Sequence, residues 1–279
     1  IYRIKQNQLT FQSMIGNGAF KTVYKGVWRG LPVAISTLKE RSDRIISRLD
    51  NEVAVGCTID HPNLIRVLGV GVPPDVPSLC VVSELVDSGT LHHLLHEERR
   101  QIDQTGKIRL IRGLLSALEY LHSISVAHRD VKSENVLVTG NLVPRLTDFG
   151  FCFQGEREEN GTTADFSQSV VGTVMYMPPE LMRGEQYNPY RADIYSTGLV
   201  IFEIMAEQLP YDDKLPQGEL VYEIAHRGVR PRVSTLSTEF PAAWLSVVEC
   251  MLGPSEQRPQ ASEVLESLVE TLELPVCPN

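Results

Sequence analysis

The pattern of apolar residues changes once along this chain, near residue 87, and that change limits the folds it can adopt. Short runs rich in β-branched and aromatic residues come first, separated by glycine-containing turns, and they predict strands. Apolar residues at helical spacing follow. Strands followed by helices are typical of an α+β fold with a cleft between the two parts. We therefore predict a small β-rich lobe over residues 1–86 and a helical lobe over residues 87–279, with a hinge at 87–89.

The individual elements can be predicted from the same patterns. Residues 192–206 are apolar nearly all round, which indicates a buried helix. A proline-rich loop is expected over 72–77, and further helices around 108–121 and over 261–274. In the first part, we expect a helix over 42–56 with Ile45, Ile46, Leu49 and Val53 on its inner side, and strands over 9–15, 22–28, 31–38, 64–70 and 79–85.

Charge and cysteine usage narrow the class of protein. The net charge of −9 argues against a nucleic-acid partner. No apolar run approaches the roughly 20 residues needed to cross a membrane. The five cysteines form no CxxC pair, which favours free thiols in a reducing compartment. We expect a cytoplasmic domain, or one on the cytoplasmic side of a membrane, that belongs to a longer protein because the chain does not begin with Met.

Four polar motifs follow one another in the second part of the chain. Residues 128–135 read HRDVKSEN, and DFG follows at 148–150, GT at 172–173 and PPE at 178–180. Either of the first motif's Asx residues would by itself be expected only to cap a loop or turn. In this order and at these separations, the motifs resemble those of eukaryotic protein kinase domains over nearly the whole chain.

The resemblance implies a bilobal kinase fold that transfers the γ-phosphate of ATP to a protein hydroxyl. This chemistry needs positioning and charge neutralisation more than covalent help. By resemblance, Asp130 orients or accepts the proton of the substrate hydroxyl, and Lys132 neutralises the γ-phosphate. Asn135 and Asp148 supply the hard oxygen ligands that Mg²⁺ prefers.

The resemblance also assigns an ATP site and a structural frame. Gly16 and Gly18 would cover the phosphates, and Glu52 would pair with the phosphate-binding lysine. Asp193 matches the buried aspartate that braces the catalytic loop in this family. Glu180 and Arg258 match a structural ion pair. The expected adenine-binding residues are Val23, Ala34 and Leu137 around the ring, the small gatekeeper Ser83, and the backbone of Glu84 and Val86.

Substrate class and regulation follow from finer similarities. Lys132 and the GT pair at 172–173 resemble serine/threonine kinases, and the general texture is similar to the tyrosine-kinase-like group. Arg129 precedes Asp130, and in kinases so built this arginine can pair with a phosphate on the activation segment. The candidate sites for an upstream kinase are Thr162, Thr163, Ser167 and Ser169, most of which we expect to be ordinary loop hydroxyls.

One expected residue is missing, because Ser36 stands where kinases carry the phosphate-binding lysine. Lys39 lies three residues on, so it should point away from the nucleotide. Lys21 shares its strand parity with Val23 and should face the phosphates, whereas Lys25 shares the parity but lies farther away. This arrangement resembles the with-no-lysine kinases, in which the lysine has moved to the glycine loop.

Two other interpretations of Ser36 remain open. In one, Lys21 is a solvated lysine and the domain is a pseudokinase, a nucleotide-binding allosteric or scaffolding module. In the other, Ser36 is an engineered replacement of an ordinary lysine. The presence of Asp130, Asn135 and Asp148 favours an active enzyme. The chloride-sensing role of with-no-lysine kinases is not carried over, since phenylalanine replaces leucine in the DFG motif.

Gly56 is a second departure from the family pattern. It lies four residues after Glu52, where kinases usually place a bulky apolar side chain in a spine through both lobes. We expect the glycine to leave a gap there and to lower helix stability by about 1 kcal/mol relative to alanine. A helix that moves easily would follow.

Overall fold

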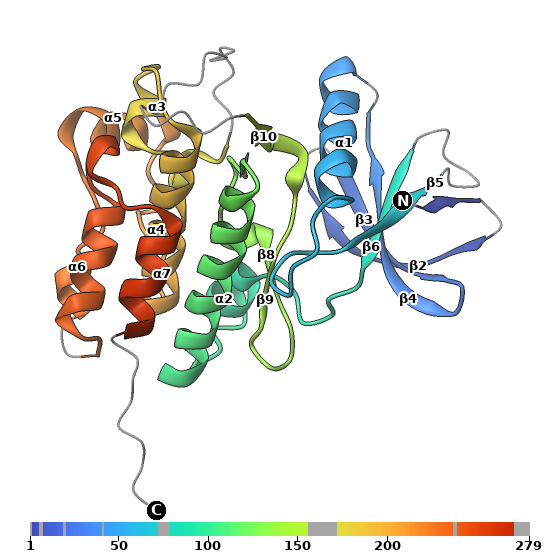
Figure 1. Ribbon diagram of the computed structural model, residues 1–279, viewed down its shortest axis with the longest axis horizontal. Helices are drawn as coiled ribbons and strands as arrows, with labels where there is room; N and C mark the ends of the chain where they lie inside the picture. Colours follow the sequence, from blue (N-terminus) through green and yellow to red (C-terminus); the bar gives the residue numbers. More distant parts are fainter. Residues whose placement is uncertain are drawn as a thin grey trace, which may run out of the picture.

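The computed structural model describes residues 2–5, 8–18, 21–40, 42–71, 79–155, 172–236 and 239–270. A β-sheet with one long helix forms one end of the molecule, and a group of helices forms the other (Figure 1). The predicted α+β fold with a β-rich part followed by a helical part is therefore confirmed. Among the helices described, none is long and apolar enough to cross a membrane.

The sheet has six strands in the order β1-β5-β6-β4-β3-β2. The sequence patterns predicted all of them except β1, which is only three residues long and pairs in parallel with β5. The other neighbours are antiparallel. The bounds are Tyr2–Ile4 for β1, Leu9–Asn17 for β2, Lys21–Trp28 for β3, Leu31–Leu38 for β4, Val67–Gly71 for β5 and Cys80–Glu84 for β6.

Side chains on β4 alternate between the two faces of the sheet. Val33 and Ile35 are fully buried in a small core on one face, together with Trp28 and Val82. Ala34 and Ser36 lie on the other face and are only half-buried. This period of two is the strand geometry that the sequence predicted.

Helix α1 (Asp43–Gly56) begins at Ser42, whose hydroxyl accepts a hydrogen bond from the Ile45 amide at 3.4 Å. Such caps satisfy amides that have no partner within the helix. Ile45 and Leu49 are buried as predicted, but Ile46 is 39% exposed, so its placement on the inner side was wrong. Neighbouring residues are about 100° apart around a helix, so Ile46 turns out of the face that its predecessor buries.

The remaining part is mainly helical, and its central helix α4 is buried on nearly all sides, as its apolar composition predicted. Asn188 caps α4 by accepting from the amides of Tyr190 and Arg191. The helices are α2 (Gln104–Ser123), α3 (Pro179–Met182), α4 (Pro189–Ala206), α5 (Gln217–Arg227), α6 (Ala242–Met251) and α7 (Ala261–Glu270), with a π-helical turn over His93–Glu97 and 3-10 turns over Ser133–Asn135, Phe149–Phe151, Val174–Tyr176, Val233–Leu236 and Ser255–Gln257.

Short strands flank the HRDVKSEN and DFG motifs: β7 (Val126–Ala127) pairs with β10 (Phe153–Gln154), and β8 (Val136–Val138) pairs with β9 (Pro144–Leu146). Leu146 also pairs with Leu64, and its carbonyl accepts from the Ile65 amide at 2.9 Å. The predicted strand over 64–70 therefore starts too early. Its first residues join β9 instead of the large sheet, and β5 begins only at Val67.

The gap predicted at Gly56 is absent. A Cβ atom built on this buried residue would lie 2.4 Å from Cγ2 of Val67 and 3.6 Å from the ring of Phe149. Val67 thus occupies the space that a larger residue would take. Gly56 is also the last residue of α1, where the loss of helix propensity matters less than in the interior.

The close packing at Gly56 predicts that even one added methyl group destabilises the protein. We expect Gly56→Ala to lower the free energy of unfolding by about 1–3 kcal/mol, measured by urea denaturation, because overpacking forces neighbours to shift. Combining it with Val67→Ala should cost less than the sum of the two changes. Gly218→Ala is the matched control, since its Cβ would meet nothing within 4 Å. Equal stability of Gly56→Ala and wild type would contradict this account.

Candidate active site

Lys21 opens β3 on the same sheet face as Ser36. In the antiparallel pairing of β3 with β4, Val23 lies opposite Ser36 and Lys21 lies opposite Leu38. Directly paired residues of antiparallel strands share a face. Lys39, which follows β4, is exposed, as the strand parity predicted.

The ammonium group of Lys21 lies between two carboxylates from distant parts of the chain. Its Nζ donates to Oε1 of Glu52 at 3.2 Å and to Oδ1 of Asp148 at 3.1 Å. The pairing with Glu52 is the one that the sequence led us to expect, whereas the contact with Asp148 was not foreseen. The structure therefore places Lys21 at the junction of β3, α1 and the DFG motif.

Burial and neighbouring charges have opposite effects on the pKa values of Lys21, Asp148 and Glu52. Burial acts to lower the pKa of Lys21, but the two carboxylates outweigh it, so the pKa of Lys21 is raised. Burial also acts to raise the pKa of Asp148, yet the charge of Lys21 holds that pKa below its usual value. For Glu52, burial is the stronger effect, and its pKa is raised although Lys21 acts to lower it. Lys21 is therefore fully protonated at neutral pH.

Helix α1 is tied to the residues around the DFG motif by further contacts. Nδ2 of Asn51 donates to the carbonyl of Cys152 at 2.6 Å. The guanidinium of Arg48 lies 4.0 Å from the ring centre of Phe151. Asp148 itself has φ 71° and ψ 69°, a left-handed conformation that aspartate tolerates better than most residues. These contacts fix where the carboxylates around Lys21 stand.

The loop that carries Asp130 is held by a buried carboxylate of α4. Asp193, which is fully buried, accepts from the backbone amides of His128 and Arg129, both at 2.7 Å. Nε2 of His122 lies 3.0 Å from the same carboxylate. The bracing that the resemblance implied for Asp193 thus has a visible geometry, and it fixes the start of the loop.

Three polar residues of that loop converge. Nδ2 of Asn135 donates to Oδ2 of Asp130 at 2.9 Å and to its carbonyl at 2.8 Å. Nζ of Lys132 lies 3.2 Å from Oδ2 of Asp130 and donates to Oγ1 of Thr173 at 2.7 Å. A carboxylate, an amide and an ammonium therefore meet beside the GT pair at 172–173.

The donor set beside this loop fits a magnesium ion. Because both hydrogen bonds of Asn135 use its amide nitrogen, its Oδ1 is left to face a ligand. The Asp148 carboxylate has one oxygen engaged by Lys21 and a side chain that is 26% exposed. Carboxylate and amide oxygens are hard ligands of the kind Mg²⁺ takes, together with phosphate oxygens.

The residues expected to bind ATP are half-buried, with one exception. Those on the strands lie on the sheet face of Lys21, since Val23 pairs with Ser36 and Ala34 pairs with Ser83. The amide of Glu84 is already bonded to the carbonyl of Arg66, so only its carbonyl can serve a ligand. All of the following are half-buried: Gly16, Val23, Ala34, Ser83, Glu84, Val86 and Leu137. Gly18 is exposed, and its amide donates to the carbonyl of Lys21 at 3.0 Å.

The remaining predicted residues are structural or fall on the activation segment. The guanidinium of Arg258 forms a buried, two-pronged ion pair with Glu180, as the resemblance implied. Arg129 has a positive φ of 66°, and its buried Nε has no hydrogen-bond partner among the residues described. The four candidate phosphorylation sites, Thr162, Thr163, Ser167 and Ser169, lie outside the described residues.

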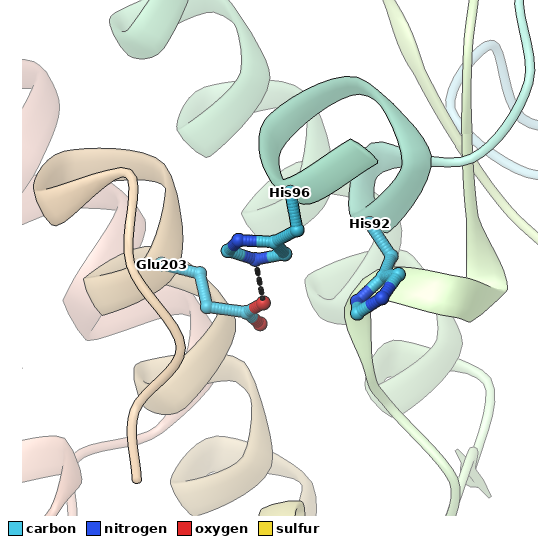
Figure 2. Close-up of side chains that lie close together, drawn as sticks. All are labelled: His92, His96 and Glu203. Atoms are coloured by element: carbon cyan, nitrogen blue, oxygen red, sulfur yellow. Dashed lines mark hydrogen bonds and ion pairs between the residues drawn. The ribbon is translucent and has the colours of Figure 1, made fainter. Parts of the chain in front are cut away.

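Sequence reasoning missed a second polar cluster behind the loop. His92 and His96 approach Glu203 of α4, and Nε2 of His96 is 2.8 Å from Oε1 of Glu203 (Figure 2). Two signals could have revealed it. The histidines are four residues apart, a spacing that puts both on one helical face, and the glutamate is the one charged residue in the buried apolar run 199–206.

Comparison with known proteins gives two findings. Residues 9–269 match the protein kinase domain family. A probable serine/threonine-protein kinase of Dictyostelium discoideum is 28% identical over 275 residues, which cover 96% of this chain. The chain spans only 28% of the length of that relative.

The bracing role of Asp193 can be tested through stability. We expect Asp193→Asn to lower the free energy of unfolding by at least about 2 kcal/mol, because bonds to a charged acceptor are lost and an amide group faces two backbone amides. Urea denaturation measures this. Asp213→Asn, an exposed matched change, should stay within about 0.5 kcal/mol of wild type. The assignment is wrong if the two variants are equally stable.

Proposed function

The chain belongs to the protein kinase domain family, and from this membership we propose that it transfers the γ-phosphate of ATP to serine or threonine hydroxyls of proteins. One observation carries the proposal. Lys21 joins Glu52 and Asp148, although the usual lysine position holds Ser36. The ionic contact on which kinases depend is thus made from a different strand.

Lys21 would anchor the nucleotide phosphates. An ammonium group has three N–H donors, and the closer contacts, with Oε1 of Glu52 and Oδ1 of Asp148, engage two of them, whereas the contact with Oε2 of Glu52 is longer, at 3.5 Å. The third can donate to a phosphate oxygen while both carboxylates stay paired. Glu52 would hold the lysine in place, as a positioning residue that does not touch the phosphates.

The catalytic loop would handle the proton and the charge. Asp130, with Asn135 bonded to one carboxylate oxygen, would use its other oxygen to orient and accept the proton of the acceptor hydroxyl. Lys132, next to the same carboxylate, would neutralise charge on the transferred phosphate. When bound through Asn135 and Asp148, Mg²⁺ would neutralise charge on the phosphate oxygens.

The choice of serine and threonine rests on finer support. The contact between Lys132 and Thr173 involves the two positions that resemble serine/threonine kinases. The Dictyostelium relative is named a probable serine/threonine-protein kinase. Because this chain covers a small part of that relative, its protein substrates and upstream kinase belong to the proposal as well. We also propose a cytoplasmic location, which is supported by the free thiols of the four cysteines in the described residues, and a lobe boundary between residues 86 and 87.

A pseudokinase is the second candidate, and Ser36 favours it. In that case Lys21 would close the site by pairing Glu52 with Asp148 and would not serve a phosphate. The domain would then bind nucleotide weakly and act as an allosteric or scaffolding module. Phosphate transfer by the purified domain separates the two functions.

The lysine itself is the decisive test. We expect Lys21→Met to lower kcat/KM for radiolabelled phosphate transfer by about 10²–10³-fold, because a cation that stabilises developing charge is lost. The kcat/KM of Lys25→Met should stay within a few fold of wild type, since Lys25 lies four residues beyond Lys21 along β3, opposite Ala34. Adding Ser36→Lys to Lys21→Met should recover part of the activity, because residue 36 lies on the same sheet face.

Two outcomes would overturn parts of this account. Equal phosphate transfer by wild type and Lys21→Met would show that Lys21 does not anchor the nucleotide phosphates. No transfer by an activated wild-type sample would favour the pseudokinase. Asp130→Asn serves as the background control, and it should lose about 10²–10⁴-fold while nucleotide binding, followed with a fluorescent ATP analogue, is retained.

Arg129 generates a separate prediction about activation. Its buried Nε lacks a partner among the residues described, and a phosphate on the activation segment would satisfy it. We expect phosphatase treatment to lower the activity of wild type. Arg129→Met should already be low and should not respond to phosphatase. A variant that responds as wild type does would exclude Arg129 as the phosphate receptor.

A further inference from the structure

Two histidines and a buried glutamate face one another on the far side of the catalytic loop. His92 directly precedes the π-helical turn over His93–Glu97, His96 lies within that turn, and Glu203 comes from α4 (Figure 2). One ligand atom from each of the three lies within 4.8 Å of the others. Neither the phosphate site nor the proposed magnesium ligands involve these residues.

The side chains are oriented by contacts of their own. Glu203 is fully buried, and its two oxygens accept from the hydroxyls of Ser133, at 3.0 Å, and Tyr176, at 2.8 Å. The rings of His92 and His96 lie with centroids 4.9 Å apart. Nδ1 of His92 lies 3.5 Å from the hydroxyl of Ser133, and His96 is the imidazole in contact with Glu203. The carboxylate is therefore held firmly, with both imidazoles close to it.

We propose that His92, His96 and Glu203 form a binding site for one zinc ion, with water completing the coordination. Two imidazole nitrogens and one carboxylate oxygen are a ligand set that zinc accepts, and three protein ligands with one open position are usual where zinc remains accessible. The side chain of His96 is 14% exposed and that of His92 is half-buried. Both therefore keep some surface from which a water molecule can approach the metal.

The geometry requires small movements. Ligand atoms around a tetrahedral zinc lie roughly 3.3 Å apart, as expected for bonds of about 2.0–2.1 Å. The His96 nitrogen and the Glu203 oxygen, now 2.8 Å apart, would separate slightly, and the ring of His92 would rotate inward. His96 would carry its proton on Nδ1, so that Nε2 offers its lone pair to the metal. Local π-helical turns frequently mark functional sites.

The ligand types separate this site from the magnesium site. Imidazole nitrogens suit zinc and other late transition metals, whereas Mg²⁺ prefers oxygen ligands and keeps its waters. Magnesium at the concentrations used with ATP should therefore not compete. The inference also does not rest on the proposed kinase activity, because binding can be measured without nucleotide.

A zinc ion there would act on the catalytic loop from behind. Ser133, which donates to Glu203, lies between Lys132 and Asn135, and Tyr176 follows the GT pair at 172–173. Drawing Glu203 toward a metal would alter both hydrogen bonds. The expected effect is a change in how the loop positions its polar groups, with the nucleotide-binding residues untouched.

The test uses metal-free protein without ATP or Mg²⁺. Zinc is titrated in competition with a chromophoric chelator, and Co²⁺ is used as a spectroscopic substitute. We expect one equivalent of zinc to bind, and cobalt to give visible absorption bands typical of nitrogen and oxygen ligands in a four-coordinate site. Zinc should also raise the Tm of the wild-type protein, since a ligand that binds only the folded state stabilises it.

Histidine variants provide the contrast. His92→Gln and His96→Gln should each weaken zinc binding by at least tenfold and remove the rise in Tm. His93→Gln is the matched control, because His93 sits in the same turn but contacts Glu97 and Glu98, and it should bind as wild type does. Circular dichroism and the Tm without zinc verify that each variant is folded.

Two results would overturn the proposal. One is the absence of saturable zinc binding by folded wild-type protein. The other is equal weakening by the His93, His92 and His96 substitutions, which would place the metal elsewhere on the surface of this turn. Either result would leave the assignment of Lys21 and Asp130 unaffected.

Discussion

The position of one ammonium group determines how the parts of this domain fit together. Lys21 bonds to residues 31 and 127 positions away in the sequence, so it joins a strand, a helix and the DFG motif. The three side chains are only partly buried, with 25% of Lys21, 13% of Glu52 and 26% of Asp148 exposed. The ammonium therefore adds to the contacts of Asn51 and Arg48 that already hold α1 beside the DFG motif.

The sheet register explains why a lysine at position 21 can do this. Val23 lies directly opposite Ser36, and Lys21 is two residues from Val23 on the same face. That is a displacement of about 7 Å along one strand and about 5 Å across to the next. A side chain with four methylene groups can span much of this distance, and it leaves a quarter of its surface exposed.

Much of this was readable from the sequence, and the failures have local causes. Strand parity predicted that Lys21 faces the same side as Val23, because the alternation of faces is a property of the backbone, and the resemblance supplied Glu52 as its partner. The contact with Asp148, the pairing of Leu64 with Leu146 and the packing of Val67 on Gly56 all depend on where distant segments meet. The spacing of apolar residues along the sequence does not predict such long-range contacts. The histidine cluster was missed because one of its three residues, Glu203, lies on another helix.

The loop over residues 128–135 is held by two buried carboxylates of one helix, α4. Asp193 accepts the amides at the start of the loop, and Glu203 accepts the Ser133 hydroxyl near its end. They are about ten residues apart on α4, which corresponds to roughly 15 Å along the axis. Because α4 is buried on nearly all sides, it fixes the distance between the two points at which the loop is held. A ligand at Glu203 would then change the position of Ser133 while Asp193 keeps the start of the loop fixed. If the proposed zinc binds, that asymmetry would move the Ser133 end of the loop without disturbing the ionic contacts of Lys21.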